Sequence, residues 1–315
     1  MSTPTSLDLP DGVRRTTIRT SRGMFAALEA TPASGVCEWE SALLVPGYTG
    51  SKEDFLAILN LLADRGRRVT AIDMRGQFET PAAADPDGYA PPELGADLVA
   101  IMQATGSRHL VGHSYGGLIA REAVLAGEQA RSMVASLTLM GSGPDALTGT
   151  RAQELTGMLA VLGIEGRELP DAATLRDGVA GVWHTYLEPQ AVAAGVPAPV
   201  VAFLGRRMLG NDPAGLVLMA QNMLAAPDRT AELARLARAG LPMLVIYGEN
   251  DNAWSPAAQE DMARRLGARR HCIPAAMHSP AVEAPATTAS ALTQFWDASE
   301  RATLTHVTVG GTGRV

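Results

Sequence analysis

The sequence lacks what several classes of protein require. No stretch of 18 consecutive apolar residues occurs, which excludes an ordinary membrane-spanning helix. Residues 1–8 lack the basic region and apolar core of a secretory signal. The only two cysteines, Cys37 and Cys272, are far apart and have no metal-ligand spacing. We therefore expect a cytoplasmic protein with no membrane partner, no metal and no disulfide framework.

Positive charge is scarce and almost entirely carried by arginine. Lys52 is the only lysine, and 33 acidic residues outweigh 26 basic ones to give a net charge of −7. This balance offers no basic patch for nucleic acid or for an anionic membrane. A small-molecule partner is the remaining expectation.

What the sequence does contain is a regular alternation of apolar runs and helical segments. Its 315 residues, 46% of them hydrophobic, suit one large α/β domain or a domain with an inserted subdomain. The strand-like segments are mostly continuous apolar runs, which is typical of a parallel sheet covered on both faces. The first two form a predicted hairpin. Strands are predicted at 13–20, 24–30, 41–45, 68–72, 108–111, 135–140, 242–247 and 270–273.

The alternation breaks between residues 145 and 228. There the apolar residues recur at helical spacing in four groups, which predicts a four-helix insertion over the carboxyl ends of the strands. The predicted organisation is a core of residues 1–144 and 229–300, a helical cap or lid of residues 145–228, and a loose C-terminal tail of residues 301–315.

The most informative motif lies between a predicted strand and a predicted helix. It reads Gly112-His113-Ser114-Tyr115-Gly116 and matches the pattern G-x-S-x-G. A serine on such a sharp turn has a strained backbone, and side chains two positions away would collide with the neighbouring strand or helix. The turn lifts the Ser114 hydroxyl out of the sheet, so Ser114 is the predicted nucleophile.

A serine nucleophile needs a base, and the base needs an orienting acid. Asp251 and His278 each follow a predicted strand and come in the expected order after Ser114. Asp145, which follows the strand at 135–140, is the rival acid, and we favour Asp251. The other histidines occupy places where packing or solvation explains them better than catalysis.

The oxyanion formed in acyl transfer needs two backbone N–H donors. The N–H of Tyr115 follows the nucleophile directly. The second donor is assigned to the N–H of Tyr48, in the glycine-containing loop 46–50 after the strand at 41–45.

Together these motifs resemble the α/β-hydrolase superfamily, in its lid-bearing serine esterase and lipase-like branch. The resemblance covers nearly all of residues 13–298. It is carried by Val-Pro-Gly-Tyr at 45–48, Asp-Met-Arg-Gly at 73–76, the serine motif at 112–117, and the segments 248–251 and 277–280. It implies the α/β-hydrolase fold, a mostly parallel central sheet flanked by helices, with an inserted helical cap.

Two departures from the family pattern stand out. Many relatives have His-Gly where this chain has Pro46-Gly47, and relatives often have a glycine and a serine after Arg-Gly, where this chain has 77–81, Gln-Phe-Glu-Thr-Pro. We expect the second departure to alter the rim of the pocket. A serine in place of an aspartate nucleophile argues against the dehalogenase and epoxide-hydrolase branches.

The favoured function is a cofactor-independent serine hydrolase, carboxylesterase-like, that cleaves a small or medium apolar carboxylic ester, thioester or lactone. A cofactor-free C–C bond hydrolase or a perhydrolase or haloperoxidase is the alternative among enzymes. A ligand receptor or binding protein with residual hydrolase activity is the alternative of another class. The candidate substrate-binding residues are Trp183, Tyr186, Phe203, Met208, Met219 and Met223.

Overall fold

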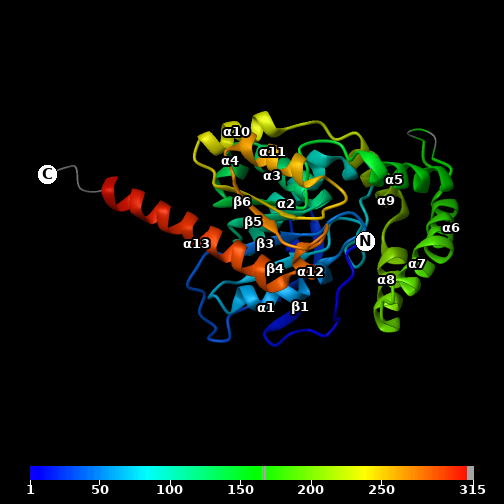
Figure 1. Cartoon of the computed structure of the whole chain (residues 1–315), viewed down its shortest axis with the longest axis horizontal. Coiled ribbons are helices and arrows are strands. Elements are labelled where there is room, and N and C mark those ends of the chain that lie inside the picture. Colours follow the sequence, from blue (N-terminus) through cyan, green and yellow to red (C-terminus); the bar gives the residue numbers. More distant parts are fainter. Residues whose placement is uncertain (165, 167, 311–315) are drawn as a thin grey trace.

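An eight-stranded sheet forms the centre of the molecule (Figure 1). The computed structural model describes residues 1–164, 166 and 168–310, with side chains up to residue 302. The strand order is β1-β2-β4-β3-β5-β6-β7-β8, and all pairs are parallel except β1 with β2 and β2 with β4. The strands are β1 (Val13–Thr20), β2 (Gly23–Ala30), β3 (Ala42–Val45), β4 (Val69–Ile72), β5 (His109–His113), β6 (Ser136–Met140), β7 (Met243–Gly248) and β8 (Arg269–Ile273).

All eight predicted strands are present, within two residues at each end. The register aligns the carboxyl ends of the central strands, because Val45 pairs with Gly112, and Met140 pairs with both His113 and Ile246. The segments that follow β3, β5 and β7 therefore emerge at one edge of the sheet, as in other open α/β sheets.

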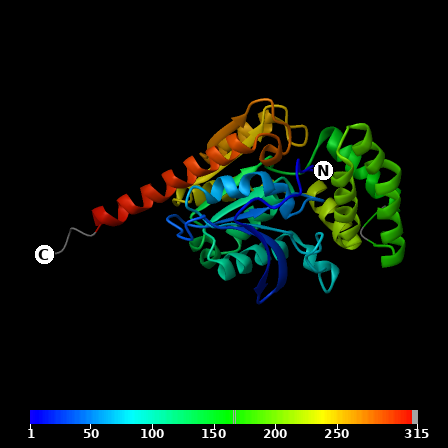
Figure 2. The same ribbon diagram turned by 90° about the horizontal axis from the view of Figure 1, so that it is seen from below.

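Helices cover both faces of the sheet (Figure 2). In β3, Leu43 and Val45 belong to one apolar cluster, whereas Ala42 and Leu44 belong to the other. The first cluster includes residues of α2 (Pro91–Thr105), α3 (Tyr115–Leu125), α10 (Thr230–Arg238) and α11 (Pro256–Leu266). The second includes residues of α1 (Leu56–Ala63), α12 (Pro280–Glu283) and α13 (Pro285–Gly310). Short elements complete the core: η1 (Lys52–Phe55), η2 (Pro86–Tyr89) and α4 (Glu128–Ser132).

The segment between β6 and α10 is helical, and Figure 1 shows its helices beside the core, at right. It contains α5 (Gly149–Val161), α6 (Ala172–Val182), α7 (Glu188–Ala193), α8 (Ala198–Gly210) and α9 (Pro213–Leu224). The second of the four predicted helices is α6, which continues through one π-helical turn, Trp183–Leu187, into α7. The predicted limits of the cap, 145 and 228, both lie in loops.

The expectation of a loose tail from residue 301 is wrong for residues 301–310. Helix α13 continues through them to Gly310. Between Pro285 and Gly310 the sequence has no proline or glycine to interrupt the backbone hydrogen bonds, so nothing local ends the helix earlier. Residues 311–315 lie outside the described part of the chain.

Candidate active site

Ser114 occupies the sharp turn between β5 and α3. Its φ of 54° and ψ of −122° lie outside the regions that non-glycine residues ordinarily adopt. The turn is held by a 2.8 Å bond from the Ser114 N–H to the Met140 carbonyl, and by a 2.9 Å bond from the Gly117 N–H to the Ser114 carbonyl. A strained residue held on both sides by backbone bonds fits the sequence-based argument for a nucleophile elbow.

The glycines around Ser114 are required by close approach. A Cβ at Gly112 would lie 2.6 Å from the Gly117 Cα, and a Cβ at Gly116 would lie 2.7 Å from the Val45 carbonyl oxygen. A Cβ at Gly117 would lie 2.6 Å from the Ser142 Cβ. Real Cβ atoms do not approach other atoms this closely, so the expectation that the positions two residues before and after Ser114 must be bare is confirmed, and the same holds at Gly117.

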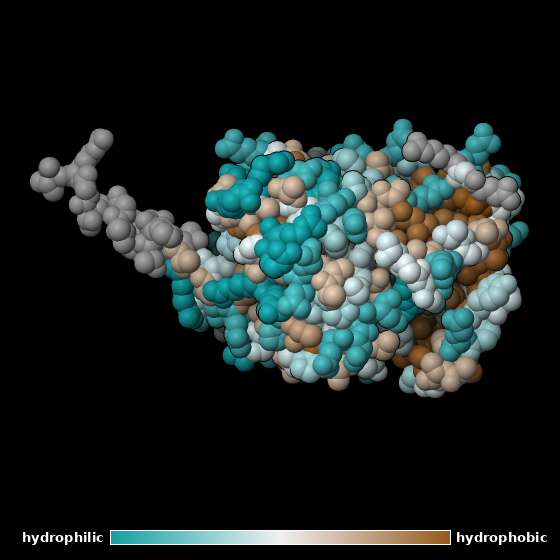
Figure 3. All heavy atoms as spheres, turned by 45° about the horizontal axis from the view of Figure 1, so that its top comes forward, coloured by the Kyte–Doolittle hydropathy of each residue, from teal (hydrophilic) through white to brown (hydrophobic). Residues whose placement is uncertain are grey.

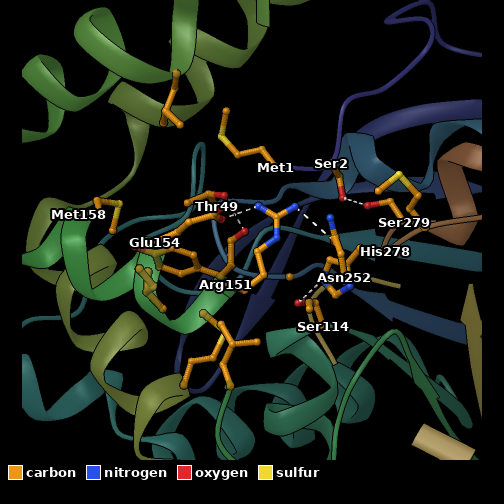
Figure 4. Close-up of a pocket in the computed structure, with 18 of the residues that line it drawn as sticks. Met1, Ser2, Thr49, Ser114, Arg151, Glu154, Met158, Asn252, His278 and Ser279 are labelled. Atoms are coloured by element: carbon orange, nitrogen blue, oxygen red, sulfur yellow. Dashed lines mark hydrogen bonds and ion pairs between the residues drawn. The ribbon is translucent and has the colours of Figure 1, made fainter. Parts of the chain in front are cut away.

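A continuous chain of hydrogen bonds joins the three residues selected from the sequence. The His278 Nε2 lies 2.9 Å from the Ser114 Oγ (Figure 4), and the His278 Nδ1 lies 2.9 Å from the Asp251 Oδ1. An ionised carboxylate can only accept, so the Nδ1 carries the hydrogen and the Nε2 accepts from the Ser114 hydroxyl. This is the tautomer that allows His278 to take a proton from Ser114.

Asp251 follows β7 and is held in place by further donors. Its Oδ1 accepts from the Ala253 N–H at 2.9 Å, and its Oδ2 accepts from the Gln259 side-chain amide at 2.9 Å. Burial alone would raise the pKa of Asp251, but the hydrogen bond and charge of His278, with the two N–H donors, outweigh it and hold the pKa below its usual value. Asp251 is therefore ionised at neutral pH.

The rival acid is elsewhere. Asp145 is exposed, and its backbone carbonyl accepts from the Trp254 indole N–H at 3.1 Å. Of the two candidates, the structure places Asp251 against the His278 Nδ1.

Two supporting residues were not identified from the sequence. Gln259, in the first turn of α11, orients the carboxylate of Asp251. His113 is buried, and its Nε2–H donates to the backbone carbonyl of His278 at 2.8 Å. Burial and the neighbouring His278 lower the pKa of His113 to about 4, so His113 is a neutral donor at neutral pH. Neither residue belongs to a spacing pattern from which the role could be inferred.

The residues that carry the two assigned oxyanion donors both lie next to Ser114, Tyr115 in sequence and Tyr48 in the fold. Tyr115 is the first residue of α3, so its N–H has no acceptor within the helix. Gly47 is so close to Ser114 that a Cβ on it would lie 2.9 Å from the Ser114 Cβ, and the next peptide N–H is that of Tyr48. Within the described part of the chain, the Tyr48 N–H makes no backbone hydrogen bond.

Ser114 and His278 lie at the wall of a cavity of about 770 Å³ between the helices of the predicted cap and the sheet core (Figure 4). Three of the six candidate substrate-binding residues line it: Tyr186, Met208 and Met223. Further apolar lining comes from α5, including Leu155 and Met158. In Figure 3, hydrophobic residues gather at the cap end of the molecule, whereas the visible face of the core is mostly hydrophilic.

The other three candidates, Trp183, Phe203 and Met219, do not line this cavity and require correction. All three are buried within the molecule. Trp183 packs against Gly205, where a Cβ would lie 3.0 Å from the indole ring, and Phe203 packs edge-on against Phe78 at 5.7 Å between ring centroids. Helical spacing identifies an apolar face, but not whether that face meets a cavity or another helix.

The cavity also has polar groups that the sequence did not reveal. Arg151, on α5, reaches across it and contacts Glu154 at 2.8 Å and Asn252 at 3.3 Å (Figure 4). Ser2 contributes its hydroxyl to a 2.8 Å bond with the hydroxyl of Ser279, next to His278. The segment 77–81, expected at the pocket rim, does not line the cavity. Gln77 is buried, and its amide donates to the Gly47 carbonyl in the loop after β3.

The described residues contain no group of three or more histidine, cysteine, aspartate or glutamate side chains that could hold a metal ion. None of the helices found among them is both long enough and apolar enough to cross a membrane.

Known proteins resemble this chain in sequence and in fold. A 110-residue stretch, 34% of this chain, is 41% identical to a Variovorax paradoxus protein provisionally named carbamate hydrolase RutD, and it spans only 40% of that protein. The fold is similar to a thermophilic esterase from Thermogutta terrifontis, with a TM-score of 0.67 and 22% identity over 91% of this chain and 99% of the esterase. It is also similar to the enol-lactonase from Burkholderia xenovorans, with a TM-score of 0.65 and 20% identity over 89% and 99% of the two chains.

The model of the α/β hydrolase family matches residues 42–291, which is most of the chain and includes β3, the Ser114 turn, Asp251 and His278. The sheet order, the helices on both faces and the hydrolase folds of the similar structures agree with that match. The chain belongs to the α/β hydrolase family.

Proposed function

We propose that this protein is a serine hydrolase that cleaves a small or medium apolar carboxylic ester, thioester or lactone through an acyl-enzyme. The observation that carries the proposal is the chain of 2.9 Å contacts from Ser114 through His278 to Asp251 at the wall of the cavity.

The chemistry follows from the tautomer of His278. The Ser114 Oγ attacks the carbonyl carbon of the ester while the His278 Nε2 takes the hydroxyl proton, and the carboxylate of Asp251 stabilises the resulting imidazolium. The N–H groups of Tyr48 and Tyr115 stabilise the tetrahedral oxyanion. The imidazolium then protonates the leaving alcohol, and water attacks the acyl-enzyme by the same sequence of proton transfers.

The cavity supports an apolar substrate with a polar group near the scissile bond. Leu155, Met158 and Met223 contribute apolar wall, and flexible methionines fit ligands of irregular shape. Arg151 and Asn252 contribute hydrogen-bonding groups on the side of Ser114 and His278 (Figure 4). Cavities of this size accommodate small organic ligands.

The similarity to the Variovorax protein, named for carbamate hydrolysis, adds carbamates to the bonds that need testing. We propose the ester as the principal substrate, because the large apolar wall favours an acyl or alkyl chain.

The test is turnover of a panel of chromogenic esters, thioesters, lactones and carbamates of graded chain length by the wild type and Ser114→Ala. The alanine variant should lose about 10⁴-fold or more in turnover while remaining folded, because it lacks the nucleophile. A fluorophosphonate should add its mass to the peptide that contains Ser114. Full activity in the alanine variant, or labelling of another residue, would refute the proposal.

A further inference from the structure

Gln77 lies in the segment 77–81, where this chain departs from the family pattern, and the structure buries it in contact with the loop that carries Tyr48. Its side chain is 1% exposed. The Gln77 Nε2 donates to the carbonyl of Gly47 at 2.9 Å, and the Gln77 Oε1 accepts from the Met74 N–H at 3.1 Å. Gln77 thus links the loop after β4 to the loop after β3.

The orientation of this amide is determined by its partners. The Met74 N–H can only donate and the Gly47 carbonyl can only accept, so the oxygen must face Met74 and the nitrogen must face Gly47. The same Gly47 carbonyl also accepts from the Gly50 N–H at 3.0 Å. Both donors hold the Gly47 carbonyl in one direction.

The Gly47 carbonyl and the Tyr48 N–H belong to one peptide unit. The described part of the chain has no cis peptide bond, and in a planar trans peptide the carbonyl and the N–H point in opposite directions. Fixing the carbonyl therefore fixes the N–H on the opposite side of the peptide. That peptide adjoins Ser114, since Gly47, Tyr48 and Ser114 all line the cavity and a Cβ on Gly47 would lie 2.9 Å from the Ser114 Cβ.

We propose that Gln77 is the positioning residue of the oxyanion hole, which it orients by holding the Gly47 carbonyl so that the Tyr48 N–H faces the Ser114 Oγ. The inference rests on the proposed function. Gln77 touches no substrate and acts only through the Gly47–Tyr48 peptide.

This role has a kinetic signature that a purely structural role lacks. A displaced N–H weakens stabilisation of the tetrahedral oxyanion but not ground-state binding of an apolar substrate, so kcat falls while KM changes little. A trifluoromethyl ketone forms a tetrahedral adduct on serine and depends on the same N–H, so its affinity falls with kcat.

The principal variant is Gln77→Met, which keeps the length of the side chain but removes both hydrogen bonds. The matched control is Thr80→Val in the same loop. The Thr80 Oγ1 accepts from the Ala26 N–H at 2.9 Å and donates to the Asp73 carbonyl at 3.0 Å, so the control loses a similar pair of bonds without contact with Gly47. Gln77→Glu is the second variant if Gln77→Met does not fold.

The measurements are kcat, KM, the inhibition constant of a trifluoromethyl ketone and the melting temperature, on full-length protein. In Gln77→Met we expect kcat to fall about 10- to 100-fold and the inhibition constant to rise by the same factor, with KM within about threefold. Thr80→Val should show a lowered melting temperature with kcat and inhibition constant within about twofold of the wild type.

Equal kcat and equal inhibitor affinity in Gln77→Met and Thr80→Val would overturn the role of Gln77, as would a change confined to KM. The serine mechanism itself is judged by Ser114→Ala in the same assay. If that variant retains turnover, the proposed function fails. If it is inactive while Gln77→Met retains wild-type kcat, only the inference fails.

Discussion

At the scale of single residues, His278 is held at three atoms. Its two ring nitrogens contact Ser114 and Asp251, and its backbone carbonyl accepts from the buried Nε2–H of His113. The imidazole and the main chain behind it are thus oriented by separate partners. In the proposed mechanism, a base held this way requires little reorganisation before it accepts a proton.

The acid can be tested by two matched amide variants. Asp251→Asn should lower kcat by about 10⁴-fold while the protein remains folded, because asparagine favours the imidazole tautomer that cannot accept from Ser114. Asp145→Asn should retain kcat within about twofold, since only the backbone carbonyl of Asp145 makes a contact near the site. Measured kcat for the two variants decides the acid, and the reverse ranking would identify Asp145.

The neutral state of His113 predicts a pH-dependent stability. Its pKa of about 4 in the folded protein lies below the ordinary value of about 6.5, so the unfolded chain binds the proton between these two pH values. The free energy of unfolding should therefore fall as the pH decreases from about 6.5 to about 4, by on the order of 3 kcal/mol from this group.

Replacing His113 with glutamine keeps an N–H donor but removes the titration. Urea unfolding of the wild type and of His113→Gln at several pH values between about 4 and 7 measures the difference. The variant should lose less stability than the wild type over this interval. Parallel curves for the two proteins would contradict the shifted pKa.

At the scale of elements, one buried charge cluster joins η1 to the loop after β4. The only lysine, Lys52, is 1% exposed, and its ammonium lies 2.8 Å from Asp73 and 2.6 Å from Glu79. The Lys52 backbone N–H also donates to Asp73 at 2.8 Å. The loop after β4 also carries Gln77, which donates to the Gly47 carbonyl in the loop after β3. The charge cluster therefore helps to hold Gln77 in place.

Lys52→Met should cost about 3–5 kcal/mol of unfolding free energy, because it leaves the carboxylate of Asp73 buried without its cation. Chemical denaturation measures the cost. Arg14→Met is the surface control, since the Arg14 side chain is 64% exposed in its pair with Glu29 and exposed pairs contribute about 0–1 kcal/mol. Similar losses of unfolding free energy in both variants would show that the buried ion pair of Lys52 stabilises the protein no more than an exposed one.

At the scale of the whole molecule, residues of α5 to α9 form one wall of the cavity and residues of the sheet core form the other. A buried ion pair joins the two parts, since the Arg207 guanidinium of α8 lies 2.7 Å from Asp54 of η1, and it also donates to the Ser2 carbonyl at 2.7 Å. The cavity therefore depends on contacts between segments more than 150 residues apart.

We expect a substitution in the helical wall of the cavity to change substrate preference and to leave the chemical step unchanged. Tyr186, in the π-helical turn, lines the cavity, and Tyr186→Ala should shift the ranking of esters by chain length, measured as kcat/KM over a graded series. Reaction with a small phosphonate should change far less, because that reagent needs Ser114 and the oxyanion donors but little of the cap.

Val192→Ala is the control for that experiment. Val192 lies on α7, is 60% exposed and does not line the cavity, so its substitution should leave the ranking unchanged. If Tyr186→Ala slowed every ester and the phosphonate by one common factor, the cap would act as a cover without influence on specificity.

The sequence by itself determined the strands, the order of the core elements and the three residues, Ser114, His278 and Asp251, that the fold joins by hydrogen bonds. Apolar runs and glycines are local signals, and strand ends that meet at one edge of a parallel sheet follow from the alternation of strands and helices. Ser114 and Asp251 are 137 residues apart in the sequence, yet in the folded protein they belong to one hydrogen-bonded chain through His278.

Only the tertiary structure decided which cap residues face the cavity and which groups support the site. Trp183 and Tyr186 are three residues apart, yet one packs against Gly205 and the other lines the cavity, because the facing partner of a helical surface is set by how the helices pack. Gln77 and His113 make hydrogen bonds to residues 30 and 165 positions away, and Gln259 bonds to Asp251 across the loop before α11. Such bonds depend on distances in the folded chain, which no local pattern of residues encodes.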